Sequence, residues 1–176
     1  AWVSGLQYTK NYKNDVLTVG TEINHTATED IIPGYNRLID QTVNSVGTYA
    51  QYEWKPSEKF IALFGGRLDN VNVKGEYSIG GINRGIDINQ TAFSPRLTLS
   101  YLFTEALKFR GGFARGFRAP QAFNEDLHIS SVGGEPQFVI LSEDLNTEYS
   151  NAYTGSFNYS KTKNLMQMDF LLEGFY

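Results

Sequence analysis

The stretch AFSPRLTLSYLFTEALKFRGGFARGF, residues 92–117, contains two runs in which apolar and polar side chains alternate. Three residues, TEA, separate the two runs. A period of two is that of a β-strand, whose successive side chains point to opposite faces of a sheet. The stretch therefore predicts two antiparallel strands joined by a tight turn. The apolar positions are Phe93, Leu97, Leu99, Tyr101 and Phe103 in the first run and Leu107, Phe109, Phe113 and Phe117 in the second.

The same alternation occurs in six further stretches, which brings the expected number of strands to eight. They span residues 1–9, 15–26, 42–54, 59–70, 148–160 and 165–176. Short connections (residues 10–14, 55–58, 104–106 and 161–164) alternate with long ones (residues 26–41, 70–90 and 118–147). In an antiparallel meander, consecutive connections emerge at opposite ends of the sheet. All tight turns then lie at one end and all long loops at the other, which is typical of outer-membrane β-barrels.

Composition excludes several classes of protein. Lys and Arg number 15 against 19 Asp and Glu, so the Arg- and Gly-rich segment around Arg110 does not belong to a basic nucleic-acid-binding chain. Cysteine is absent, which excludes disulfides and thiolate zinc sites. No run approaches the roughly 20 apolar residues that a membrane helix needs. We therefore expect an all-β protein without a nucleic-acid partner.

Nothing in the sequence indicates an enzyme or a cofactor. The two histidines, His25 and His128, are far apart, and no HExxH, GxSxG or Walker pattern occurs. Two acidic pairs, Glu125/Asp126 and Glu143/Asp144, flank one long connection and offer oxygen ligands of the kind that calcium prefers. Solvated loop charge is the simpler interpretation of both pairs, so we expect no metal site.

Aromatic residues gather toward both ends of the apolar parity in several strands, as in Trp2 and Tyr8 or Tyr149 and Tyr159. Such rings suit the two interfaces of a membrane, where an apolar body and a polar edge are both satisfied. Alternation alone does not tell lipid from a protein core, so a secreted β-sandwich that binds a ligand remains an alternative. A self-contained eight-stranded barrel, acting as an adhesin or structural protein, is another, and its first and last strands would pair. Arg115 has the wrong parity for a charge, unless it lies at headgroup level or a bulge turns it inward.

Several motifs are similar to those of the TonB-dependent outer-membrane receptors, which import siderophores, cobalamin and similar cargo. YAQYEWKPSEKFIALFGGRLDN resembles a hairpin of the family that closes on Gly-Arg-x-Asp, and FSPRLTLSY resembles the strand after it. FRGGFARGFRAPQAFNEDL and LNTEYSNAYTGSFNY resemble the two strands around a large outer loop, although Asn146 and Thr147 stand where Lys-Pro is usual. The resemblance covers about residues 42–176.

The resemblance implies a transmembrane barrel of about 22 strands around an N-terminal plug, which eight strands do not complete. Residues 1–176 are accordingly expected to be a single internal segment of the barrel domain, with the plug absent. The implied location is the outer membrane of a Gram-negative bacterium. The implied partners are membrane lipid, the TonB energy-transducing complex acting through the missing plug, and a small-molecule or metal-chelate cargo such as a ferric siderophore or cobalamin. A glycan importer stays open.

Candidate functional residues fall into two groups. Loop residues that offer charge, hydrogen bonds or an aromatic face to cargo are Tyr35, Arg37, Arg84, Asp87, Arg118, Asn124 and His128. Polar residues expected to face the lumen, where cross-strand ion pairs would keep the inner wall wet and in register, are Arg67, Asp69, Arg96 and Arg110.

Overall fold

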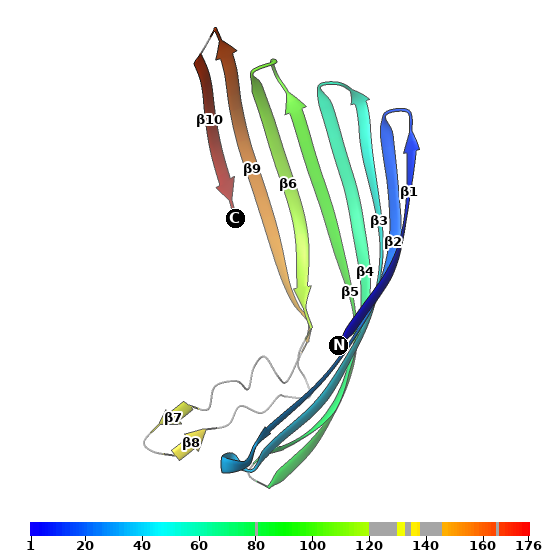
Figure 1. Cartoon of the computed structure of the whole chain (residues 1–176), viewed down its shortest axis with the longest axis vertical. Helices are drawn as coiled ribbons and strands as arrows, with labels where there is room; N and C mark the ends of the chain where they lie inside the picture. The colour runs from blue at the N-terminus through cyan, green and yellow to red at the C-terminus, as the bar shows by residue number, and fades with distance from the viewer. Residues whose placement is uncertain (80, 120–129, 133–134, 138–145, 165) are drawn as a thin grey trace.

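The chain folds into one antiparallel sheet of eight strands, in the order β1-β2-β3-β4-β5-β6-β9-β10. The computed structural model describes residues 1–79, 81–119, 130–132, 135–137, 146–164 and 166–176. Figure 1 shows a tall, curved wall with β1 and β10 at its two edges, and within the described residues these two strands do not pair. The elements are β1 (Trp2–Tyr12), β2 (Asp15–Ile32), the 3-10 helix η1 (Pro33–Tyr35), β3 (Arg37–Ser57), β4 (Phe60–Ile79), β5 (Ile82–Leu102), β6 (Leu107–Arg118), the short pair β7 (Ser130–Val132) and β8 (Glu135–Gln137), β9 (Glu148–Lys163) and β10 (Met166–Phe175).

The predicted all-β meander is confirmed, including the tight turns gathered at one end of the wall (Figure 1). Two of those turns contain a residue in the left-handed conformation, Lys13 with φ 45° and Asn164 with φ 56°. Asn adopts this conformation more readily than most residues, because its short side chain bonds locally. No helix among the described residues is long and apolar enough to cross a membrane.

Two of the expected long connections are wrong. The pairing of β2 with β3 continues to Ile32 and Arg37, and that of β4 with β5 continues to Ile79 and Ile82. Residues 26–41 and 70–90 are therefore mostly strand, and the first of these hairpins is closed by η1 and by Asn36 at φ 50°. The third long connection, residues 118–147, holds β7 and β8 among its described residues.

The reason is that alternation continues beyond the predicted strands with its parity exchanged. We call the face that carries Trp54, Phe93 and Tyr153 the aromatic face, and the face that carries Arg67 and Asp69 the charged face. Beyond Phe93 and its neighbours, apolar residues move to the charged face and polar residues to the aromatic face, so a search for one fixed parity ends too early. The exchanged residues are Ile39, Val43, Val71, Val73, Ile86 and Ile88 on the charged face and Thr42, Asn44, Asn70, Asn72, Lys74, Asn89 and Thr91 on the aromatic face.

In the half of the sheet away from the tight turns, the apolar residues of the charged face form a small core. Val71 and Val73 pack with Ala119, and all three are buried. Ile39 and Val73 are the largest fully buried side chains, each 1% exposed. Burial of these side chains stabilises the long hairpins of β2 to β5, since an isolated two-stranded hairpin is only marginally stable in water.

Aromatic rings form a continuous row across β3, β4 and β5 at the turn end of the wall. Trp54 meets Phe60 with 5.9 Å between ring centroids, Phe60 meets Tyr101 at 6.4 Å, and Tyr101 meets Phe103 at 4.9 Å. From this row to Phe93 the strand spans about 27 Å at roughly 3.4 Å per residue. That length is comparable with the apolar band, about 25 Å tall, on the outside of membrane barrels.

Candidate functional site

The charged face carries an ion-pair network that crosses three strands. Arg67 on β4 donates from Nε to both carboxylate oxygens of Asp69, at 2.8 and 3.0 Å. Its Nη2 lies 3.2 Å from Oε1 of Glu22 on β2, on the far side of β3. Asp69 is 4% exposed, and this guanidinium is the partner that its buried carboxylate contacts. Arg67 and Asp69 lie two residues apart on one strand, so the ion pair of this network that crosses strands is the one between Arg67 and Glu22.

Two glycines make room for the long side chains on this face. Gly47 lies between Glu22 and Asp69 in the strand register, and the guanidinium of Arg67 occupies the space where a Cβ would stand. Gly20 plays the same part for Tyr49, whose ring lies where the Cβ of residue 20 would be and whose hydroxyl donates to Gln7 Oε1 at 2.8 Å. In both places a long side chain reaches across the neighbouring strand, because the residue that it passes over is a glycine and has no side chain there.

Arg96 and Arg110 lie on the charged face, as expected. Arg96 stands opposite Gly65 and Ala114 in the register, and Arg110 stands opposite Ser100 and Ser156. In the part of the chain that the structure describes, neither arginine makes an ion pair. These two guanidinium groups therefore differ from Arg67, since no carboxylate of the described wall holds them in place.

Arg37 is not the loop residue that we expected. It is the first residue of β3, on the charged face, and is 4% exposed. Its Nη2 lies 3.7 Å from Asp30 Oδ2, yet neither Nε nor Nη2 has a hydrogen-bond partner. The position was misplaced because residues 26–41 were taken as a loop, whereas they form the end of a hairpin.

Arg84 and Asp87 are also strand residues, both in β5, so the expectation of a loop is wrong for them too. Arg84 is exposed on the charged face, opposite Tyr77. Asp87 lies on the aromatic face and pairs with Lys74 at 3.4 Å between Nζ and Oδ2. The two candidates have opposite parity on β5, although both border one hollow at this end of the wall.

Arg118, the last residue of β6, is likewise in a strand, and its Nη2 lies 3.0 Å from Glu148 Oε2 on β9. Tyr35 closes η1, and its side chain is outside the described part of the structure. Asn124, His128 and the acidic pairs at 125–126 and 143–144 also lie outside the described residues. Among the described residues, no group of three or more His, Cys, Asp or Glu side chains is arranged to hold a metal ion.

Asp15 ties two neighbouring turns together at the other end of the wall. Its Oδ1 accepts a hydrogen bond from the backbone N–H of Lys55 at 2.8 Å, and its Oδ2 accepts one from the Tyr52 hydroxyl at 2.7 Å. The Lys55 N–H, followed by the Tyr52 hydroxyl, holds the pKa of Asp15 below its usual value. The carboxylate therefore stabilises this end of the wall in its charged form.

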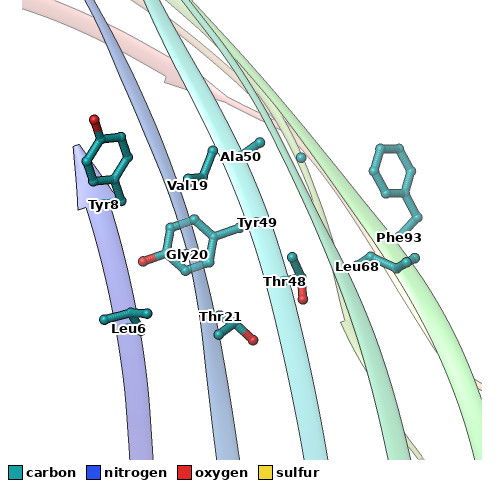
Figure 2. A pocket seen from close by; sticks show the side chains of 11 residues that line it. Leu6, Tyr8, Val19, Gly20, Thr21, Thr48, Tyr49, Ala50, Leu68 and Phe93 are labelled. Atoms are coloured by element: carbon teal, nitrogen blue, oxygen red, sulfur yellow. The ribbon is translucent and has the colours of Figure 1, made fainter. Parts of the chain in front are cut away.

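A shallow hollow of about 650 Å³ lies on the aromatic face over β1 to β5 (Figure 2). Leu6 and Tyr8 border it on β1, and Leu68 and Phe93 border it on β4 and β5. Its floor consists of smaller residues, which are Val19, Thr21, Thr48, Ala50 and Gly66. The hollow lies on the opposite face from the Arg67 network, so it is no extension of that polar surface.

The comparisons with known proteins agree with this geometry. The model of the TonB-dependent receptor-like β-barrel matches residues 1–176, the whole chain. The chain belongs to the TonB-dependent receptor β-barrel family. Members of this family are transporters and not enzymes, so the expected lack of an enzymatic function is confirmed. No protein among the curated sequences matches the chain.

Two solved structures of receptors share the fold. One is the alcaligin outer-membrane receptor FauA from Bordetella pertussis, with a TM-score of 0.63 and 14% identity. The other is the ferric yersiniabactin uptake receptor FyuA from Yersinia pestis, with a TM-score of 0.57 and 14% identity. The matches cover 97% and 96% of this chain and 27% of each receptor. The chain thus spans about a quarter of the length of these receptors.

Sequence reasoning missed the partners that make the charged face of this TonB-dependent receptor segment a network. Glu22, Gly47 and Tyr49 were not among the candidates, although each lies on the polar parity of its strand. Their parity was visible in the sequence. Their registration beside Arg67 and Gly20 was not, because it depends on how far each strand slides against the next.

Proposed function

We propose that this chain is a stretch of the barrel wall of an outer-membrane receptor of a Gram-negative bacterium, which imports a ferric siderophore or cobalamin. The family supports transport, and the two similar structures are receptors for alcaligin and for ferric yersiniabactin. The observation that carries the proposal is the exchange of polarity along β2 to β5. In each of these strands, one face is apolar along half of the length and the opposite face is apolar along the other half. Such a strand passes from one surrounding medium, such as lipid, into another, such as water.

The exchange matches a wall that leaves a membrane. In the half of the wall that ends in the tight turns, exposed apolar residues such as Phe64 and Leu68 cover the aromatic face, which suits contact with acyl chains. In the half that ends in the long hairpins, that face carries asparagines and charges, which suits water, while the charged face buries Ile39 and Val73. The long hairpins then stand above the membrane and enclose a vestibule for cargo. The tight turns lie on the periplasmic side.

In this arrangement the charged face lines the lumen, with Arg67, Asp69, Arg96 and Arg110 in the wall. The candidates for cargo contact remain those at the outer end: Tyr35, Arg37, Arg84, Arg118, Asn124 and His128. Asp87 is the weakest of the original set, because it points away from the lumen and is paired with Lys74. The plug, a separate part of the receptor, would couple the barrel to the TonB complex, so the wall itself needs no energy-transducing residue.

The two alternatives find no support in the structure. A self-contained eight-stranded barrel requires β1 to pair with β10, whereas these strands are the two edges of the described sheet. A β-sandwich requires two packed sheets, whereas the eight long strands form one sheet and β7 and β8 form a small separate pair.

Uptake in cells that carry the full-length receptor tests the proposal. Deletion of the gene should abolish growth on one ferric siderophore as the iron source, or uptake of labelled cobalamin, and loss of TonB should have the same effect. Complementation with R84A should lower the rate of uptake, since Arg84 faces the lumen. D87A is the matched control on the same strand and should transport like the wild type. Undiminished uptake of every cargo in the deletion strain would refute the proposal.

A further inference from the structure

Lysine and arginine are distributed unequally along the wall. Seven of the eight lysines lie in the tight turns or within three residues of them, where the turn residues are 13–14, 58–59, 103–106 and 164. None of the seven arginines lies so close, and Lys74, the eighth lysine, pairs with Asp87 in the long hairpin of β4 and β5. The tight turns, which Figure 1 shows together at one end, therefore carry a lysine rim. It consists of Lys10, Lys13, Lys55, Lys59, Lys108, Lys161 and Lys163.

The lysine rim has a surplus of positive charge. Lys55 pairs with Glu53, and three carboxylates lie as close to the turns as the lysines do, those of Asp15, Glu58 and Glu105. The other six lysines against these three carboxylates leave three positive charges. Four members of the rim are exposed and, within the described part of the chain, make no ion pair: Lys10, Lys13, Lys59 and Lys161. Their ammonium groups are open to an anion from outside the chain.

The lysine rim adjoins the row of aromatic rings at the turn end of the wall. Lys59 directly precedes Phe60, a member of that row. Lys10 lies on the aromatic face two residues beyond Tyr8, and its Nζ lies 4.8 Å from the ring centroid of Tyr12. Such rings suit the boundary between acyl chains and headgroups, and a lysine stem that starts there carries its ammonium into the charged layer. The lysines thus lie where the headgroups of a membrane would be.

The choice of lysine over arginine indicates a mobile partner. Two arginines of the wall show the contrast, because their partners are fixed to the protein. Arg67 is held by Asp69 on its own strand. Arg115 stacks on Tyr149, with 3.9 Å between the guanidinium carbon and the ring centroid. A planar guanidinium suits such fixed geometry, whereas an ammonium on a flexible four-carbon stem can follow an anion that moves. Phosphates in a fluid membrane are anions of that kind.

We propose that the lysine rim binds the phosphates of anionic phospholipids in the leaflet on the side of the tight turns. From the middle of the wall to the turns, the aromatic face presents an apolar band, then the aromatic row, then the lysines. These layers match the acyl chains, the glycerol region and the phosphates of a lipid, whereas an acidic protein partner would account for the lysines alone. The rim lies at the opposite end from the long hairpins, so this role is separate from any contact with cargo.

Photo-crosslinking of the full-length receptor in phosphatidylcholine vesicles tests this inference. The vesicles carry a trace of phosphatidylglycerol or of phosphatidylcholine with a diazirine in the headgroup, and mass spectrometry maps labelled peptides, so only this stretch is read. The anionic probe should label residues 10–14 and 55–60 about tenfold more than the zwitterionic probe, because each lysine near an anionic surface strengthens association about fivefold at low salt. In K10Q/K13Q/K59Q the excess should disappear, although a diazirine inserts into any side chain. K74Q, at the other end of the wall, is the matched control and should keep it.

Three results would overturn the inference: equal labelling by the two probes, an excess that persists in the triple variant, or loss of the excess when soluble polyglutamate is added, which would assign the rim to an acidic protein. Heat-dependent mobility on gels verifies that each variant is folded, and K59Q alone provides the test if the triple variant is not. The inference rests on the proposed place of the chain in an outer membrane. Absence of the receptor from the outer-membrane fraction would refute that proposal, whereas equal labelling of a correctly located receptor refutes only the role of the lysine rim.

Discussion

Replacement of Gly47 on the charged face should disturb the ion-pair network directly, because only side-chain atoms of Arg67 and Asp69 occupy the space of its Cβ. Glu22 and Asp69 stand opposite it on the two neighbouring strands, and Arg67 passes over it to join them. A Cβ at residue 47 would collide with the guanidinium of Arg67 and lie 2.5 Å from Oδ1 of Asp69. Replacement of Gly47 by Ala should therefore push Arg67 aside and leave the buried carboxylate of Asp69 without its partner.

The size of the effect follows from two opposing contributions. Hydrogen bonds between charged groups are worth about 1.5–3 kcal/mol each, and the partly exposed end of Arg67 can swing away, so we expect a loss of roughly 2 kcal/mol. Alanine in a strand gains about 0.5–1 kcal/mol over glycine because the unfolded chain has less freedom to lose. The free energy of unfolding of G47A should thus fall by about 1–1.5 kcal/mol.

Urea unfolding of the full-length receptor in detergent micelles measures this change. The matched control is G65A, on the same face, where the nearest atom to a new Cβ is 3.7 Å away, an ordinary contact. G65A should be unchanged or slightly more stable than the wild type. In an R67M background the guanidinium is absent and no ion pair with Asp69 is left to break, so the additional substitution G47A should destabilise much less than it does in the wild type. If G47A is as stable as G65A, or if its full cost persists in R67M, the assigned role of Gly47 is wrong.

Three further predictions concern the two ends of the wall. D15N should remove the stabilisation that the charged Asp15 carboxylate provides. The wild type keeps this stabilisation above about pH 4 and loses it as the pH falls through the lowered pKa of Asp15. The urea midpoints of unfolding of the wild type and D15N should therefore converge in acid. I39A should cost about 2–5 kcal/mol in urea unfolding, because Ile39 is fully buried in the outer half, and a cost under half a kcal/mol would contradict that burial. R118A should cost at most about 1 kcal/mol, because the pair of Arg118 with Glu148 is exposed, and a larger loss in the same assay would show that the pair is more than a surface contact.

Much of the wall could be read from the sequence because its causes are local. The alternation in residues 92–117 predicted β5 and β6, and β6 was placed to the residue at its beginning. Parity alone placed Arg67, Asp69, Arg96 and Arg110 on one common face, and the register of the strands puts all four on the charged face. Parity is a property of neighbouring residues in one strand, and it needs no knowledge of the rest of the molecule.

Parity within one strand did not predict the half of the wall that lies away from the tight turns. Residues 26–41 and 70–90 keep the period of two but exchange the apolar and polar parities, so they were taken for loops, and Arg37, Arg84 and Asp87 were misplaced with them. The exchange has a physical reason only if each strand continues from one surrounding medium into another, and this is a property of the whole wall that a short stretch of sequence does not reveal.

By itself the sequence determined that the chain is a meander of eight antiparallel strands with tight turns at one end, since strand period and turn residues act over a few neighbouring positions. The tertiary structure alone decided which side chains meet across strands. Arg67 reaches Glu22 because Gly47 stands between them, and Arg115 stacks on Tyr149 because β6 and β9 are paired in one register. Register is set by the summed packing of whole strands, and a shift of one residue would place each of these groups on the other face.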